Sequence, residues 1–144
     1  MTINVYCDGG SRGNPGPGAS AFVVYDKKGA LLGKGGKNLG RTTNNVAEYN
    51  AVIEALSWVF KNAKTETEKN KFASRGPEVR FFLDSQLVVN QLTGKFRIKN
   101  KDLINLAAKI KTAERNFSGR IEYFFIPRSK NKVADMLVNR ILDA

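Results

Sequence analysis

The sequence predicts an α/β fold in which one mixed β-sheet is covered by helices. Apolar segments of strand period come first and are joined by short turns, which is typical of antiparallel hairpins. Helical segments then alternate with strands to the end of the chain, and strands joined through a helix pair in parallel. With 144 residues the chain can bury one core but not two, so residues 1–144 are expected to form a single domain.

A first strand is predicted at residues 2–8, where apolar and polar side chains alternate. Ile3, Val5 and Cys7 share one face and are expected to point into the core. A buried thiol is therefore a better interpretation of Cys7 than a catalytic nucleophile. Asp8 is expected to end the strand, which places its carboxylate at the rim of the sheet.

Residues 9–18 are rich in glycine and proline and predict a turn, with short strands to follow near 19–25 and 30–39. A glycine-rich segment can also bind the phosphates of a dinucleotide, but such a loop must open a helix. Pro15, Pro17 and the strand that follows exclude that alternative.

A long helix is predicted from Thr43, because apolar residues recur there at helical spacing and Thr43 or Asn44 can serve as the N-cap. The polar segment 61–77 ends in Gly-Pro, so the helix is expected to continue for a turn or two before an exposed surface insertion. The apolar stripe of the helix consists of Val46, Tyr49, Ile53, Leu56 and Phe60.

Acids mark the ends of elements in the second half of the chain as well. A predicted strand at 79–83 stops directly before Asp84, and Asp135 lies in the first turns of the last predicted helix. The full order is strand-strand-strand-helix-strand-helix-helix-strand-helix. The remaining elements are a brief helix closed by Gly94, a helix at 102–117, a strand at 121–126 and a helix at 131–142.

The charge balance favours nucleic acid as a partner. Lys and Arg number 24 against 13 Asp and Glu, and the formal net charge of +11 attracts polyanions over long distances. Basic residues concentrate between positions 95 and 132, which favours a surface that follows a nucleic-acid backbone over an ordinary solvated face. The sequence shows neither an apolar run of membrane-spanning length nor a signal-peptide pattern, so no membrane partner is expected.

The chain has one cysteine and no histidine. A lone cysteine excludes an internal disulfide and is typical of a reducing compartment, so we expect a cytoplasmic protein, and we expect a monomer. The absence of histidine excludes histidine-based nucleophilic triads and histidine-ligated zinc. Any catalysis must then depend on carboxylates.

Four carboxylates at strand ends and in the opening turns of helices are the candidate catalytic and metal-binding groups: Asp8, Glu48, Asp84 and Asp135. Converging carboxylates would repel one another unless a cation lay between them, and oxygen ligands suit Mg²⁺ or Mn²⁺. Two such ions about 3.5–4 Å apart can activate water and stabilise the leaving oxygen of a phosphodiester. Each acid alone has a simpler interpretation, as a helix-dipole residue or a turn former.

Four segments, in order along nearly the whole chain, together resemble type 1 ribonuclease H. Each segment is moderately specific alone, and each supplies one acid where the family has one. The segments are CDGGSRGNPGPG at 7–18, TTNNVAE at 42–48, DSQ at 84–86 and NKVAD at 131–135.

The resemblance implies an RNase H-like fold, with a five-stranded mixed sheet in the strand order 3-2-1-4-5. It also implies an endonuclease that hydrolyses the RNA strand of RNA–DNA hybrids with two metal ions and leaves 5′-phosphate and 3′-hydroxyl ends. The catalytic, metal-binding acids would be Asp8, Glu48, Asp84 and Asp135.

The same resemblance implies a set of substrate contacts. Amide side chains would contact the minor groove and the RNA 2′-hydroxyls, the groups that distinguish RNA from DNA. Phe96 would pack on a deoxyribose, and Ser11 is a further expected contact. The amides are Asn14, Asn44, Asn45 and Gln86, and the residues expected to hold a phosphate of the DNA strand are Arg41, Thr43 and Asn100.

The chain departs from the family pattern in its loops. Many relatives place a histidine before the last acid, whereas Arg128, Ser129 and Lys130 stand here, and Arg128 is a candidate substitute. Residues 94–100 lack the basic protruding loop of some relatives. The insertion 61–77 is longer than the connection expected in the family.

Two other functions are consistent with the sequence. The missing histidine fits a non-catalytic nucleic-acid-binding module of the same fold. The acids also fit a related metal nuclease that acts on duplex RNA or branched DNA.

Overall fold

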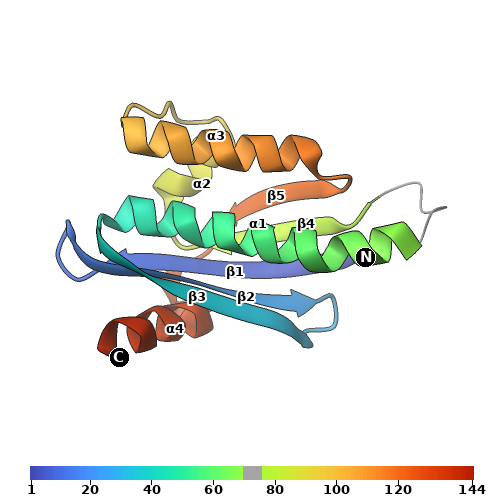
Figure 1. Cartoon of the computed structure of the whole chain (residues 1–144), viewed down its shortest axis with the longest axis horizontal. Helices are drawn as coiled ribbons and strands as arrows, with labels where there is room; N and C mark the ends of the chain where they lie inside the picture. Colours follow the sequence, from blue (N-terminus) through green and yellow to red (C-terminus); the bar gives the residue numbers. More distant parts are fainter. Residues whose placement is uncertain (70–75) are drawn as a thin grey trace.

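The structure, a computed structural model, describes the backbone of residues 1–69 and 76–144 and the side chains of residues 1–62 and 76–144. Helices α1, α2 and α3 lie on one face of the sheet and α4 lies on the other (Figure 1). No helix within these ranges has the length and apolar character needed to cross a membrane. The elements are β1 (Thr2–Ser11), β2 (Gly16–Asp26), β3 (Leu31–Thr42), α1 (Asn44–Lys69), β4 (Glu78–Leu83), α2 (Gln86–Leu92), α3 (Lys101–Asn116), β5 (Arg120–Phe125), the short 3₁₀ helix η1 (Arg128–Lys130) and α4 (Lys132–Asp143).

The described strands form one five-stranded sheet in the order β3-β2-β1-β4-β5. β1 pairs with β2 and β2 with β3 in antiparallel fashion, whereas β1 pairs with β4 and β4 with β5 in parallel. The parallel pairs are those joined through helices, as the sequence predicted. The mixed sheet, its strand order and the order of the main helices and strands are therefore confirmed.

The main core lies between the sheet and helices α1 to α3. Ile3, Val5 and Cys7 of β1 are at most 1% exposed. They pack in one apolar cluster with Val52 and Leu56 of α1. Burial raises the pKa of the Cys7 thiol well above its usual value, so the group stays a protonated core residue, as predicted.

Helix α4 covers the opposite face through a smaller apolar cluster. Ala19 and Ala21 of β2 pack there with Val138 of α4. Small residues on the sheet let the helix approach closely: a Cβ on Gly36 would lie 2.5 Å from the Cδ1 of Ile141. This close packing holds α4, and the acid in its first turn, against the sheet.

The first hairpin is longer than the sequence predicted. β1 does not end at Asp8, because residues 9–11 continue to pair with β2. The glycine-rich segment is therefore mostly strand, and only residues 12–15 are left between β1 and β2. Asp8 still lies at a rim of the sheet, since the parallel pairing of β1 with β4 ends at Cys7 and Leu83.

Helix α1 begins directly after Thr43, which is the N-cap. The Thr43 hydroxyl accepts a hydrogen bond from a first-turn backbone N–H at 3.3 Å. The helix continues to Lys69, slightly further than the predicted turn or two. The rest of the predicted insertion 61–77 includes residues 70–75, which lie outside the described residues.

Gly9 is the point where α1 crosses β1. A Cβ there would lie 2.3 Å from the backbone carbonyl carbon of Ala47, a contact that only a backbone shift could relieve. We expect Gly9→Ala to lower the free energy of unfolding by about 2 kcal/mol or more, measured by urea denaturation. Gly10→Ala is the matched control, because the nearest atom to its Cβ would be 4.0 Å away. Equal stability of the two variants would contradict this account of the crossing.

Candidate active site

Asp8 and Asp84 lie next to each other because β1 and β4 are parallel neighbours. Cys7 and Leu83 form the last pair of the parallel register, so the next residue on each strand carries a carboxylate at the same end of the sheet. Asp8 is 5% exposed, and the side chain of Asp84 is 5% exposed. These two shielded carboxylates form the centre of the candidate site.

Asp135 comes from the first turn of α4, and Asn131 fixes the start of that helix against the two strands. The amide nitrogen of Asn131 donates to the backbone oxygen of Cys7 at 2.8 Å and to Oδ2 of Asp84 at 3.3 Å. Asn131 is buried, so both bonds are shielded from water. The sequence interpretation did not assign Asn131 to the site, although its position just before the helix that carries Asp135 was a signal for such a role.

Glu48 reaches the site from the first turns of α1, where the helix crosses β1. The missing side chain of Gly9 permits this approach, because a Cβ there would lie 2.4 Å from the backbone nitrogen of Glu48. Oε2 of Glu48 is buried and has no hydrogen-bond partner among the residues that the structure describes. A buried carboxylate oxygen without a donor is a suitable place for a cation.

Asp8, Glu48, Asp84 and Asp135 are called the rim acids below, and their electrostatic coupling shows that they share one site. Burial, followed by the charges of Asp84 and Asp135, raises the pKa of Asp8 to about 8. The guanidinium of Arg128 acts in the opposite direction. Burial is also the main cause that raises the pKa of Glu48 to about 7, against a hydrogen bond from a neighbouring hydroxyl. Carboxylates coupled in this way are stabilised by a proton or a cation.

The donor set fits a hard divalent cation that also binds substrate oxygens. The rim acids offer only oxygen ligands, which suits Mg²⁺ or Mn²⁺. In the described part of the chain, no three acidic or cysteine side chains converge tightly enough to enclose an ion by themselves. Mg²⁺ in proteins usually takes one or two carboxylates together with waters and substrate phosphates. The rim acids therefore fit an open site better than they fit a closed cage, and a phosphodiester would complete the open site.

Three of the expected substrate residues are linked beside the start of α1. Oδ1 of Asn44 accepts hydrogen bonds from the backbone nitrogen and the hydroxyl of Ser11, at 2.9 and 3.1 Å. The backbone nitrogen of Asn44 donates to Oδ1 of Asn14 at 3.0 Å. Asn45 follows in the first turn of α1, and Gln86 begins α2 with an exposed side chain. The structure thus brings Ser11, Asn14 and Asn44 into direct contact and places the other two amides at helix starts.

Two of the three residues expected to hold a phosphate line the same cavity. Arg41 and Thr43 border a surface cavity of about 560 Å³, with Asp102 and Asn105 of α3 in its wall. Asn100 is not among its lining residues. Instead, the Asn100 side chain caps α3 and accepts a hydrogen bond from a first-turn N–H at 3.1 Å. Asn105 is a polar wall residue that the sequence interpretation missed.

Phe96 and Arg128 both keep exposed side chains. Phe96 is 51% exposed. Nε of Arg128 lies 3.8 Å from Oδ2 of Asp84, and the Arg128 side chain is 75% exposed. Because its basic partner is mostly in solvent, this ion pair contributes little to stability. Arg128 is therefore positioned to lower the pKa values of nearby acids while its guanidinium remains accessible.

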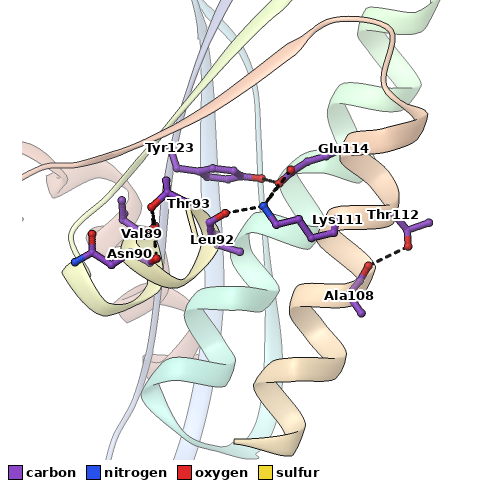
Figure 2. A network of polar contacts seen from close by, with 9 residues as sticks. All are labelled: Val89, Asn90, Leu92, Thr93, Ala108, Lys111, Thr112, Glu114 and Tyr123. Carbon is purple, nitrogen blue, oxygen red and sulfur yellow. Dashed lines mark hydrogen bonds and ion pairs between the residues drawn. The ribbon is translucent and has the colours of Figure 1, made fainter. Parts of the chain in front are cut away.

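A polar network behind the site holds helix α2 against α3 and β5 (Figure 2). Nζ of Lys111 donates to the backbone oxygen of Leu92, the last residue of α2, at 2.6 Å, and to the carboxylate of Glu114 at 3.2 Å. The hydroxyl of Tyr123 donates to the same carboxylate at 2.7 Å. At the other end of α2, Ser85 is the N-cap. Both ends of this short helix are thus fixed, which holds the segment that follows β4 in place.

Comparison with known proteins identifies relatives over the full length of the chain. A family model described as RNase H matches residues 1–142. The chain is 36% identical over 145 residues to the bifunctional protein Rv2228c of Mycobacterium tuberculosis, which covers 100% of this chain and 36% of the relative. It is 36% identical over 141 residues to ribonuclease HI of Halobacterium salinarum, which covers 98% of this chain and 64% of the relative. The chain thus spans less than two thirds of the length of these two relatives.

Solved structures give the same result for the fold. LC11-RNase H1, isolated from compost by a metagenomic approach, matches with a TM-score of 0.88 and 37% identity, over 99% of this chain and 96% of that one. The structure of LC11-RNase H1 in complex with an RNA/DNA hybrid matches with a TM-score of 0.82 and 38% identity, over 96% and 94% of the two chains. The likeness therefore covers the whole sheet and its helices.

The raised pKa values predict that the protein loses stability as pH rises. The folded-state values of about 8 for Asp8 and about 7 for Glu48 lie above those of unfolded carboxyls, so the folded state keeps protons that the unfolded state releases. Below about pH 4, ionisation of these two carboxyls does not affect the free energy of unfolding. Above about pH 8, it lowers that free energy by the full amount. In the presence of a chelator, we expect the unfolding temperature to fall by about 5 °C or more between about pH 5 and about pH 9.

Asp8→Asn should flatten this dependence, because the variant has no carboxyl to titrate at that position. Asp143→Asn is the control, since Asp143 is an exposed acid at the end of α4 and should leave the slope unchanged. Equal slopes for the wild-type protein and Asp8→Asn would contradict the assignment.

Proposed function

The chain belongs to the RNase H family, and from this membership we propose that it is an endonuclease that hydrolyses the RNA strand of RNA–DNA hybrids and leaves 5′-phosphate and 3′-hydroxyl ends. The observation that carries the proposal is the mutual coupling of the rim acids at the end of β1 and β4. A similar protein has been solved with an RNA/DNA hybrid, which supports that substrate class. The net charge of +11 also supports an anionic substrate.

The rim acids would hold Mg²⁺, or Mn²⁺ in its place, with two ions per site when substrate is bound. Such ions supply an activated water and stabilise the charge on the leaving oxygen. The chain itself holds the acids in place. Asn131 orients the Asp84 carboxylate with a donated hydrogen bond, and Ser85 favours the charged form of Glu48 in the same way.

Selectivity for RNA would come from the amides beside the rim acids. The Asn44 side chain is held by Ser11, and the Asn14 side chain is held by the backbone nitrogen of Asn44, so both amides are oriented before substrate arrives. A preorganised amide loses less side-chain entropy when it binds a 2′-hydroxyl. Asn45 and Gln86 would contact the minor groove from the same side.

The cavity at Arg41 and Thr43 would hold a phosphate of the DNA strand, and Phe96 would pack on a deoxyribose nearby. Asn100 would donate to the same phosphate through its amide nitrogen, because the cap of α3 uses only its Oδ1. The backbone contacts would confer a steep salt dependence on binding.

A reducing compartment such as the cytoplasm fits the buried free thiol of Cys7, and the proposal is for a monomer.

Replacement of one central acid tests the proposed function directly. We expect Asp8→Asn to lower Mg²⁺-dependent cleavage of a labelled RNA–DNA hybrid by at least about a hundredfold, because a metal ligand is lost, while hybrid binding is retained. Glu122→Gln is a control, since Glu122 pairs with Arg120 on β5. Duplex RNA and branched DNA are tested in parallel. Full activity of Asp8→Asn, or preference for either alternative substrate, would contradict the proposal.

Removal of the Arg128 charge should move the pH–rate profile. Arg128 lowers the pKa values of Asp8 and Glu48, so Arg128→Ala should raise both and shift the acidic limb of the profile to higher pH by roughly half a unit. Arg120→Ala is the matched control, because that guanidinium faces Glu122 instead. A profile that shifts to lower pH, or does not shift, would show that Arg128 does not tune the rim acids.

A further inference from the structure

A second cavity lies beside the rim acids, on the face of the sheet that α4 covers. Its volume is about 410 Å³, which lies within the usual range for small-molecule sites. None of the residues predicted to bind substrate or metal lines this cavity, which is called the outer slot below. Its lining includes Asn4 and Tyr6 of β1, Tyr25 of β2, Lys27 directly after β2, and Lys130 and Lys132 beside the start of α4.

One wall of the outer slot is aromatic and rigid. The rings of Tyr6 and Tyr25 meet edge to face, with centroids 5.7 Å apart and planes at 80°. Tyr6 also stacks on Phe82 of β4 at 4.9 Å, and Phe82 stacks on Phe124 of β5 at 5.6 Å. This row of rings crosses four strands, and Tyr6 is held between Tyr25 and Phe82. Fixed aromatic rings offer a stacking surface at a low cost in side-chain entropy.

The lining of the outer slot is also positively charged. Lys27, Lys130 and Lys132 are exposed, and none of them forms an ion pair with a carboxylate in the described ranges. The acid in the wall, Asp26, is already engaged, because its Oδ1 accepts hydrogen bonds from two backbone amides of the β2–β3 turn, at 2.8 and 2.9 Å. The outer slot thus combines free ammonium groups with aromatic rings.

The outer slot is connected to the rim acids through Asn131. This residue lines the outer slot, and its amide nitrogen bonds to Oδ2 of Asp84. Ser129 and Lys130 in the same wall directly follow Arg128, whose guanidinium lies near Asp84. A polynucleotide held at the rim acids therefore has the outer slot as its immediate neighbour on the α4 side.

We propose that the outer slot binds a nucleotide of a single-stranded segment that continues beyond the hybrid, with its base against Tyr6 and Tyr25 and its phosphate among the lysines. The proposal rests on the proposed function, because the neighbouring rim would hold the hybrid. Base stacking on aromatic rings and phosphate contacts with lysines are the interactions that single-stranded nucleic acids use without sequence preference. An acidic peptide would satisfy the lysines but has no comparable reason to lie beside a nuclease site.

The experiment compares binding of a blunt hybrid with that of hybrids carrying one single-stranded tail of about eight nucleotides, a length typical of small binding domains. Fluorescence anisotropy is measured with a chelator present, so that no cleavage occurs. The tail is placed at the 5′ or the 3′ end of either the RNA or the DNA strand, which identifies the strand that enters the outer slot. We expect at least one tailed hybrid to bind about tenfold more tightly than the blunt hybrid, an effect in the range of one stacked base and its phosphate contact.

Variants at the edge of the outer slot show whether the gain arises there. Lys27→Gln and Tyr25→Leu should each remove most of the gain and leave binding and Mg²⁺-dependent cleavage of the blunt hybrid unchanged. Tyr25→Phe should keep the gain, because the ring remains. Lys28→Gln is the matched control from the same turn, since Lys28 does not line the outer slot.

Two results would overturn the inference: no tail improves binding, or Lys27→Gln and Tyr25→Leu keep the full gain. Competition by polyglutamate without any gain from a tail would assign the outer slot to an acidic peptide instead. Cleavage of the blunt hybrid by the wild-type protein is a separate measurement, so failure of the nuclease function is distinguished from failure of the outer slot.

Discussion

The parallel pairing of β1 with β4 is the constraint on which the candidate site depends. It places Asp8 and Asp84 on adjacent strands at the same end of the sheet, where each is shielded from water by the protein. The remaining rim acids are brought to this point by helices on opposite faces, α1 through its crossing at Gly9 and α4 through its packing on the small residues of β2. A register shift of one residue would turn one aspartate to the other face of the sheet and separate the pair.

The elements could be predicted from the sequence because their apolar periods are strong. The rim acids could be identified from their positions at strand ends and helix starts, whereas the strand order followed from the resemblance to a family. The predicted end of β1 was wrong because a glycine can indicate either a turn or a close contact between backbones. Gly9 was interpreted as a turn residue, whereas it is a strand residue that makes room for α1. Asn100 and Asn131 show a second limit: a sequence identifies an amide but not the atoms that it will bond. The aromatic row at the outer slot depends on neighbours from four strands, which no local pattern contains.

The rim acids lower the stability of the fold while they form the candidate site. The raised pKa values of Asp8 and Glu48 mean that the folded state resists their ionisation, and the buried Oε2 of Glu48 lacks a donor within the described residues. Apolar residues of the same size would be more favourable at such positions. The large core between the sheet and helices α1 to α3 reaches the rim at Cys7 and Leu83, and its burial can offset this cost.

The hydrogen bond from Asn131 to the backbone of Cys7 joins residues that are 124 positions apart in the sequence. Contacts of such long range form only after most of the chain is available, because closing the loop between them costs entropy. During synthesis on the ribosome, β1 emerges before α4, which carries Asp135. A nascent chain therefore has no complete rim until α4 has left the ribosome, so the proposed hydrolysis of RNA cannot begin before that point.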